Sequence, residues 1–79
     1  MIEDLDVVAL TIALPDLGLA VGDVGTVVHV YQDGKAFEVE FMTLVGETID
    51  VVTLEAGQIR PLATSEIAHA RQLARSAAE

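Results

Sequence analysis

The sequence predicts a mainly β protein, in which a small five-stranded antiparallel barrel is followed by a C-terminal α-helix. The first observation is the pair Asp33-Gly34, which lies between two apolar segments. Such a pair is typical of a β-hairpin turn that needs positive φ at both central residues. The second is the apolar content, 52% of the chain and mostly Val, Ala, Leu and Ile, which suits the core of a β-sheet. The third is a change to helical spacing of the apolar residues after Thr64.

The 79 residues allow one domain with a small core. We expect strands at residues 6–14, 24–31, 36–44, 48–54 and 59–62, separated by a loop at 15–23, turns at 32–35 and 45–47, and a 3₁₀ turn at 55–58. The first of these strands alternates weakly between apolar and polar residues, which is typical of a strand covered on both faces. Pro61 confines the last strand to an edge or an end of the sheet. The barrel therefore spans residues 1–62.

The hairpin turn predicts a register for its two strands. If Asp33 and Gly34 are the central residues, Gln32 faces Lys35 and the pairing continues outward. One face then pairs Val30 with Phe37, Val28 with Val39 and Thr26 with Phe41, and the other pairs Tyr31 with Ala36, His29 with Glu38 and Val27 with Glu40. Because the first face is almost wholly apolar, we expect it to form the core. The residues expected inside are Val28, Val30, Phe37, Val39 and Phe41, and those expected outside are His29, Glu38 and Glu40.

Residues 63–79 are expected to form the helix. Their apolar side chains recur at helical spacing, at Ile67, Ala70, Leu73, Ala74 and Ala77. Thr64 or Ser65 can cap its N-terminus. An Ala-rich helix of about fourteen residues is marginal in water by itself. We therefore expect it to dock on the barrel, on another protein or on a second copy of the chain.

Charge is distributed unevenly along the chain. Residues 1–59 contain eleven acidic side chains and one basic side chain, Lys35, whereas residues 60–79 are slightly basic. A negative field of this kind repels phosphate backbones, so we expect no direct binding of nucleic acid. It favours a protein partner with a basic surface, or it serves only to keep the domain soluble.

The composition also restricts the compartment and the chemistry. The chain has no cysteine, so it has no disulfide and no thiolate metal site. No apolar segment approaches the roughly 20 residues that span a bilayer. The acidic N-terminus lacks the basic segment and the apolar stretch of a secretion signal. We expect a cytoplasmic protein that does not associate with membranes.

Two groups of residues have side chains or spacing that could support chemistry. Glu38 and Glu40 share one strand face with His29 opposite, a set that can hold a divalent cation or transfer protons. An outer strand face offers no cleft, however, so we interpret these residues as a solvated surface. The segment Gly22-Asp23-Val24-Gly25 lacks the lysine and the following helix of a phosphate-binding loop. We interpret its glycines, with Gly18, as relieving backbone strain, and expect no catalytic residue, metal or cofactor.

Four segments in this order carry a resemblance to a known family. They are GLAVGDVGTVV (18–28), FEVEF (37–41), VTL (52–54) and QIRPL (58–62). Over about residues 6–62 the chain resembles a family of small bacterial proteins catalogued as a domain of unknown function. Five short strands, a long first loop and a 3₁₀ turn before the last strand also resemble the SH3-like barrel. A weaker resemblance, in residues 22–27, is to the SH3-like barrels of the nitrile hydratase small subunit and of photosystem accessory subunits, which are non-catalytic scaffolds.

These observations predict a non-catalytic, acidic protein-binding module. The family resemblance implies a small bacterial regulator or a neutralising partner of the antitoxin or immunity type. Two alternatives stay open: an acidic mimic of nucleic acid that inhibits a nucleic-acid-binding protein, and a structural accessory subunit of a multi-chain enzyme. The candidate partner-binding residues are Glu38, Glu40 and Asp23 from the acidic part, and Ile67 and Leu73 from the expected helix.

Overall fold

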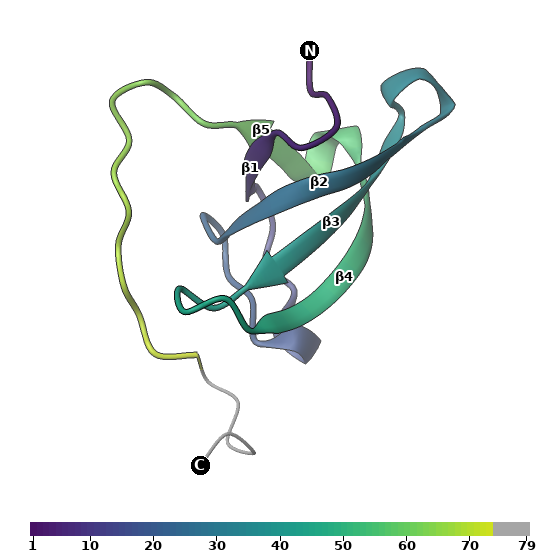
Figure 1. Ribbon diagram of the computed structural model, residues 1–79. Coiled ribbons are helices and arrows are strands. Elements are labelled where there is room, and N and C mark those ends of the chain that lie inside the picture. The colour runs from purple at the N-terminus through teal and green to yellow at the C-terminus, as the bar shows by residue number, and fades with distance from the viewer. Residues whose placement is uncertain (74–79) are drawn as a thin grey trace.

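The computed structural model describes residues 1–73 of the chain, and they form one five-stranded antiparallel sheet (Figure 1). The order of the strands in the sheet is β4-β3-β2-β1-β5. The strands are β1 (Val7–Leu10), β2 (Val24–Tyr31), β3 (Ala36–Met42), β4 (Thr48–Glu55) and β5 (Ile59–Pro61), and the 3₁₀ turns are η1 (Pro15–Leu17), η2 (Gln32–Gly34) and η3 (Ala56–Gln58). The five predicted strands and the 3₁₀ turn before the last strand are therefore confirmed.

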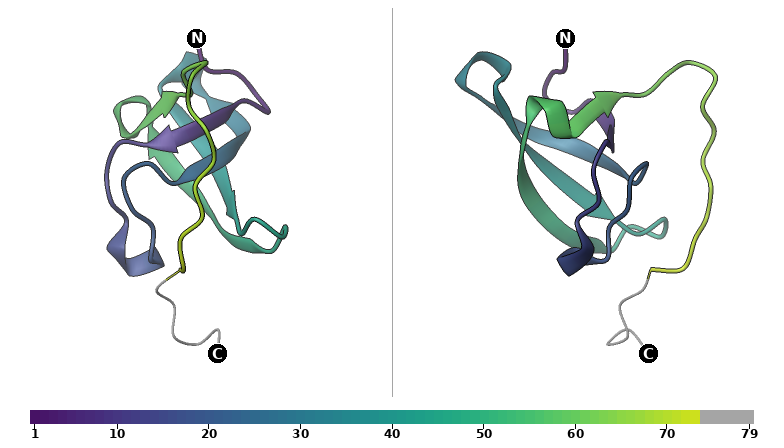
Figure 2. Two further views of the ribbon diagram at one scale, coloured as in Figure 1. Left: turned by 90° about the vertical axis from the view of Figure 1, so that its left-hand side faces the viewer. Right: turned by 180° about the vertical axis from the view of Figure 1, so that it is seen from behind.

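The sheet is not closed into a barrel, and this part of the prediction is wrong. Strands β4 and β5 are its two edges, and no ladder joins them although η3 connects them directly. One reason is that β1 ends at Leu10 instead of continuing to Leu14, because the chain turns away there. The Thr11 hydroxyl donates to the carbonyl of Gly57, and Leu14 pairs with Leu19 across η1. With β1 and β5 this short, the sheet curls over its core without closing (Figure 2).

The core lies inside this curl. It consists of nine buried apolar residues, Val8, Leu10, Leu19, Val27, Phe37, Val39, Phe41, Leu54 and Ile59. Ala9 is also buried, although it points to the opposite face of β1 from Val8 and Leu10. The prediction that the first strand is covered on both faces is thus confirmed for these three residues.

The β2–β3 hairpin follows the predicted register only near its turn. The pairs Tyr31–Ala36, Val30–Phe37 and His29–Glu38 form as expected. The turn itself is longer than predicted: Gln32 has positive φ together with Asp33 and Gly34, the three residues form η2, and Gln32 does not pair with Lys35 in the ladder. A β-bulge at Val28 then shifts the rest by one residue, so that Val27 faces Val39, Thr26 faces Glu40 and Gly25 faces Phe41. The expected burial of Val28 is wrong: Val27 is 0% exposed and Val28 is 40% exposed.

The space around Gly25 gives the physical reason for the bulge. A Cβ atom at this position would lie 2.6 Å from Cγ1 of Val39 and 2.9 Å from a ring carbon of Phe41. Only glycine fits opposite Phe41, whereas the predicted register would place Thr26 there. The role predicted for this glycine is therefore wrong, since close approach and not backbone strain requires it, while Gly18 and Gly22 do have positive φ.

The adjacent valines of the bulge test this register directly. We expect Val27→Ala to lower the free energy of unfolding by about 2–3 kcal/mol, because it leaves a cavity in the core. The same truncation at the exposed Val28 is expected to change it by less than about 0.5 kcal/mol. Urea denaturation of the two variants measures the difference. Equal losses of unfolding free energy, or a larger loss for Val28→Ala, would contradict the bulge and favour the predicted register.

The predicted C-terminal helix is absent from the part of the chain that the structure describes. Residues 63–73, here called the tail, contain one turn and otherwise run extended past the face of β5 and β1 (Figure 2). The turn is held by Glu66, whose carboxylate accepts hydrogen bonds from the Ala63 N–H and from the Arg60 guanidinium. A short helix without a docking surface is only marginally stable, so these contacts stabilise the extended conformation more than helix formation would. Residues 74–79 of the expected helix lie outside the described residues.

Every helical segment in residues 1–73 is a three-residue 3₁₀ turn. None of them has the length or the apolar character that a membrane-spanning helix needs.

Candidate functional site

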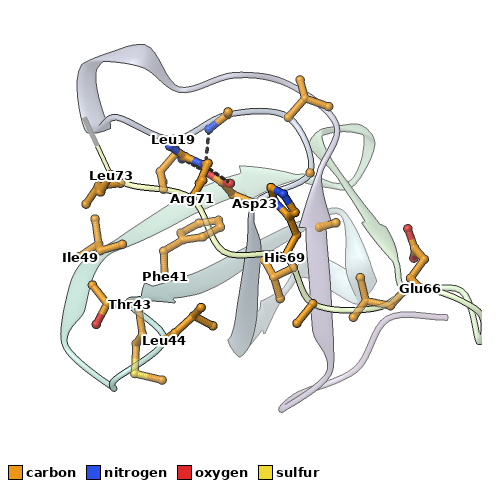
Figure 3. Close-up of a pocket in the computed structure, with 18 of the residues that line it drawn as sticks. Leu19, Asp23, Phe41, Thr43, Leu44, Ile49, Glu66, His69, Arg71 and Leu73 are labelled. Carbon is orange, nitrogen blue, oxygen red and sulfur yellow. Dashed lines mark hydrogen bonds and ion pairs between the residues drawn. The ribbon is translucent and has the colours of Figure 1, made fainter. Parts of the chain in front are cut away.

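An arginine from the tail is bound by the loop that precedes β2. Nε of Arg71 donates to Oδ1 of Asp23 at 3.0 Å, and one terminal nitrogen donates to Oδ2 of the same carboxylate (Figure 3). That nitrogen also donates to the carbonyl of Gly18. The N–H of Ala20 donates to Oδ2 of Asp23 at 2.8 Å and so holds the carboxylate in place. We call the Gly18 carbonyl, the Ala20 N–H and the Asp23 carboxylate the arginine cradle.

The electrostatics of the cradle favour the ion pair. Burial by itself would raise the pKa of Asp23, but the hydrogen bonds from Arg71 and from the Ala20 N–H outweigh it and lower that pKa below its ordinary value. The hydrogen bond to Asp23 in turn raises the pKa of Arg71. The Asp23 side chain is 20% exposed and that of Arg71 is 35% exposed, so the pair is partly shielded from water. Both groups are therefore charged at neutral pH.

A groove of about 720 Å³ lies between the tail and the sheet, beside the cradle. Its volume is within the range of pockets that bind small molecules or short peptide segments. The body of the protein contributes Leu19, Phe41 and Ile49 to its lining, and the tail contributes Leu73 (Figure 3). Ile67 of the tail also lines the groove. The groove therefore combines an apolar lining with one charged anchor.

A second ion pair attaches the tail to the body near the start of the tail. Arg60 and Glu66 form a two-pronged ion pair with distances of 3.0 and 2.7 Å. The hydrogen bond from Arg60, followed by the one from the Ala63 N–H, lowers the pKa of Glu66 to about 2. The tail is thus attached to the body through side chains at Glu66 and at Arg71.

The predicted site residues divide into two groups. Asp23, Ile67 and Leu73 all line the groove, although the two tail residues reach it from an extended segment and not from a helix. Leu73 is half-buried there, whereas Ile67 is 91% exposed. Glu38 and Glu40 lie on the outer face of β3, and neither lines the groove. The structure therefore contains two separate candidate surfaces.

The carboxylates of Glu38 and Glu40 are oriented by hydroxyl groups of the neighbouring strands. Thr53 donates to Glu38 at 2.6 Å and Tyr31 donates to the same oxygen at 3.3 Å. Thr48 donates to Glu40 at 2.7 Å. Desolvation, with the negative charge of Glu38, raises the pKa of Tyr31, so its hydroxyl stays a donor.

His29 faces Glu38 across the strands as predicted, but it is not an ion-pair partner. Its ring packs edge-on against Tyr31, with ring centroids 4.4 Å apart. Within residues 1–73, no group of three or more His, Asp and Glu side chains lies close enough to hold a metal ion. The set formed by His29, Glu38 and Glu40 is therefore an acidic and aromatic surface.

Sequence reasoning missed the partners that complete both surfaces. Arg71 is 48 positions away from Asp23, and Thr53 is 15 positions away from Glu38. For Thr53, alternation with the apolar Val52 and Leu54 on a predicted strand is a usable signal. Thr48 lies five positions earlier, where simple alternation would place it on the opposite face, and a register shift between Phe41 and Met42 changes its position. No local signal connects Arg71 with the loop at residues 18–23.

The comparison with family models defines the class of protein. Residues 4–61 match the family described as Domain of unknown function (DUF4926), and the chain belongs to this family. The match includes Asp23, Glu38 and Glu40, and it ends before the tail. No curated protein and no solved structure matches the chain.

Proposed function

We propose that this protein is a non-catalytic binding module that recognises a basic protein through the outer face of β3. The observation that carries this proposal is the pair of carboxylates at Glu38 and Glu40, each held by a threonine hydroxyl and neither ion-paired within residues 1–73. Twelve acidic residues lie in that part of the chain, and only Asp23 and Glu66 are engaged in ion pairs there. Most of the negative charge is therefore available to a partner.

The arrangement of this face suits an interface. Because hydroxyl groups already orient the carboxylates, binding loses less conformational freedom there. Val51 lies opposite Glu40 on β4 and is 43% exposed, and Tyr31 lies beside Glu38. Aromatic and apolar side chains within a charged rim are typical of protein–protein interfaces. Complementary charge on the partner would chiefly accelerate association.

The biological role we infer is that of a small bacterial regulator or neutralising partner of the antitoxin or immunity type, acting in the cytoplasm. A likeness to SH3-like scaffolds, which we infer, would support a binding role. It rests on the long loop after β1 and the 3₁₀ turn η3 before a short β5, in a sheet that stays open.

The two alternatives receive less support. A mimic of nucleic acid needs a regular series of carboxylates, and the positions opposite Glu38 and Glu40 on β4 are the uncharged Thr53 and Val51. An accessory subunit is favoured by one observation, the adjacent Leu44 and Val45 in the loop between β3 and β4, which are 78% and 85% exposed. This loop would be its docking point.

A capture experiment with a charge-matched control tests the proposal. The immobilised full chain is exposed to lysate of the native host at low and at physiological salt, and the retained protein is identified and then titrated. We expect a basic protein whose affinity falls about tenfold or more in the double variant Glu38→Gln, Glu40→Gln, because both attractive charges are lost while the side-chain shape is kept.

The control variant is Glu3→Gln, Asp4→Asn, which removes the same charge from the exposed N-terminus. We expect it to retain most of the affinity. A partner held equally well by both double variants, or equally well at both salt concentrations, would argue against the acidic face. Retention of DNA or RNA in a parallel binding assay would refute the electrostatic argument altogether.

A further inference from the structure

We propose that the arginine cradle and the body's wall of the adjacent groove are a receptor for an extended, arginine-bearing segment of the basic partner, and that the tail, which fills the cradle and forms the other wall of the groove, is an intramolecular competitor. This inference rests on the proposed function and names the means by which the partner would be recognised. The cradle is a surface separate from the outer face of β3.

The geometry of the cradle selects a guanidinium group. Three acceptors, both carboxylate oxygens of Asp23 and the carbonyl of Gly18, receive hydrogen bonds from two nitrogens of Arg71. Such planar, two-pronged recognition matches arginine and not the single ammonium group of lysine. The Ala20 N–H fixes the carboxylate from behind, so the acceptor is already oriented when an arginine arrives.

The receptor and its present occupant come from different parts of the chain. Gly18, Ala20 and Asp23 lie within the family match at residues 4–61, whereas Arg71 lies beyond it. Among the described residues, no backbone hydrogen bond joins the tail to the sheet. The tail is therefore attached by exposed or partly exposed side chains alone, and a competing segment can displace it.

The groove defines what accompanies the arginine. Leu73, two residues after Arg71, is half-buried and lines the groove together with the apolar Leu19, Phe41 and Ile49. An extended segment with arginine followed two residues later by a large apolar residue would occupy both places. The body, with eleven acidic side chains and one basic side chain in residues 1–59, attracts such a segment when it is basic.

The test uses the full chain and a synthetic peptide of residues 63–73, which contains the arginine and the leucine. Binding is followed by the NMR signals of the Ala20 and Asp23 amides in the wild type and in Arg71→Ala, whose own tail can no longer fill the cradle. We expect the variant to bind the peptide at least tenfold more tightly than the wild type. Replacing arginine by lysine in the peptide is expected to weaken binding at least tenfold.

Two control variants complete the design. Lys35→Ala removes the same charge from the distant hairpin turn and is expected to bind the peptide as weakly as the wild type does. Adding Asp23→Asn to Arg71→Ala is expected to abolish binding while the circular dichroism spectrum stays unchanged. Equal binding by the wild type and Arg71→Ala, or equal binding of the arginine and lysine peptides, would overturn the inference.

Sedimentation tests whether the tail of a second copy of the chain fills the cradle. A concentration-dependent dimer of the wild type that is lost in Arg71→Ala would show that the tail of a second copy fills the cradle, which would refute the assignment to a partner.

The experiments also distinguish failure of this inference from failure of the proposed function. If the captured partner depends on Glu38 and Glu40 but not on Asp23, the receptor is refuted and the function stands. If the peptide binds as expected but no basic protein is captured, the function is refuted and the arginine selectivity of the cradle stands.

Discussion

Replacing Phe41 with alanine is expected to remove a large part of the free energy of unfolding. Phe41 is 1% exposed and is the largest of the fully buried side chains. Removing a buried phenylalanine ring costs about 3–5 kcal/mol, because the transfer free energy is lost and a cavity stays behind. A chain of 79 residues has a total stability of about 4–12 kcal/mol, so this cost is a large part of it.

Urea denaturation monitored by circular dichroism measures this effect. The control is Met42→Ala, at the next position of the same strand, where the side chain is 43% exposed. We expect the control to change the free energy of unfolding by less than about 1 kcal/mol. A Phe41→Ala variant with the urea midpoint of the wild type would show that β3 presents its other face to the core.

The second large effect is expected for Gly25→Ala, which adds a single methyl group. The new Cβ would lie 2.6 Å from Cγ1 of Val39 and 2.9 Å from both the Glu40 carbonyl oxygen and a ring carbon of Phe41. Val39 and Phe41 are fully buried and the carbonyl belongs to the β-ladder, so none of them can move cheaply. We expect a loss of about 1–3 kcal/mol or more from overpacking.

Gly57→Ala is the matched control for this substitution. A Cβ at Gly57 would have no neighbour within 4 Å, and this glycine does not need positive φ. Its replacement is expected to be neutral or slightly stabilising, because alanine reduces the freedom of the unfolded chain. Chemical denaturation of both variants provides the comparison. If Gly25→Ala were as stable as Gly57→Ala, the close approach of β2 and β3 at this position would be refuted.

The candidate site could be predicted from the sequence only as separate residues. The acidic excess of residues 1–59 indicates Asp23, and the apolar stripe of the expected helix indicates Leu73. The groove that contains both depends on Arg71, which lies 48 positions from Asp23 and has no local pattern in common with it. A salt bridge between residues so far apart in the sequence depends on how the chain folds back on itself, which no local spacing of residues indicates.

The sequence by itself determined the number of the strands, their order along the chain and the approximate ends of all but the first, which ends at Leu10. These depend on local physical chemistry: the positive φ that Asp33 and Gly34 tolerate, the alternation of apolar residues from Phe37 to Phe41, and the restriction that Pro61 places on the last strand. The same is true of the weak alternation at Val8–Leu10, which correctly indicated burial on both faces.

Only the tertiary structure decided the bulge at Val28, the open sheet and the path of the tail. The bulge arises because Phe41 needs a residue without a side chain opposite it, which Gly25 supplies from the neighbouring strand. The tail does not form the helix that its spacing favours, because a short isolated helix gains too little by itself. An ion pair with Asp23, which is 48 positions from Arg71, and a local one between Arg60 and Glu66 hold it extended instead.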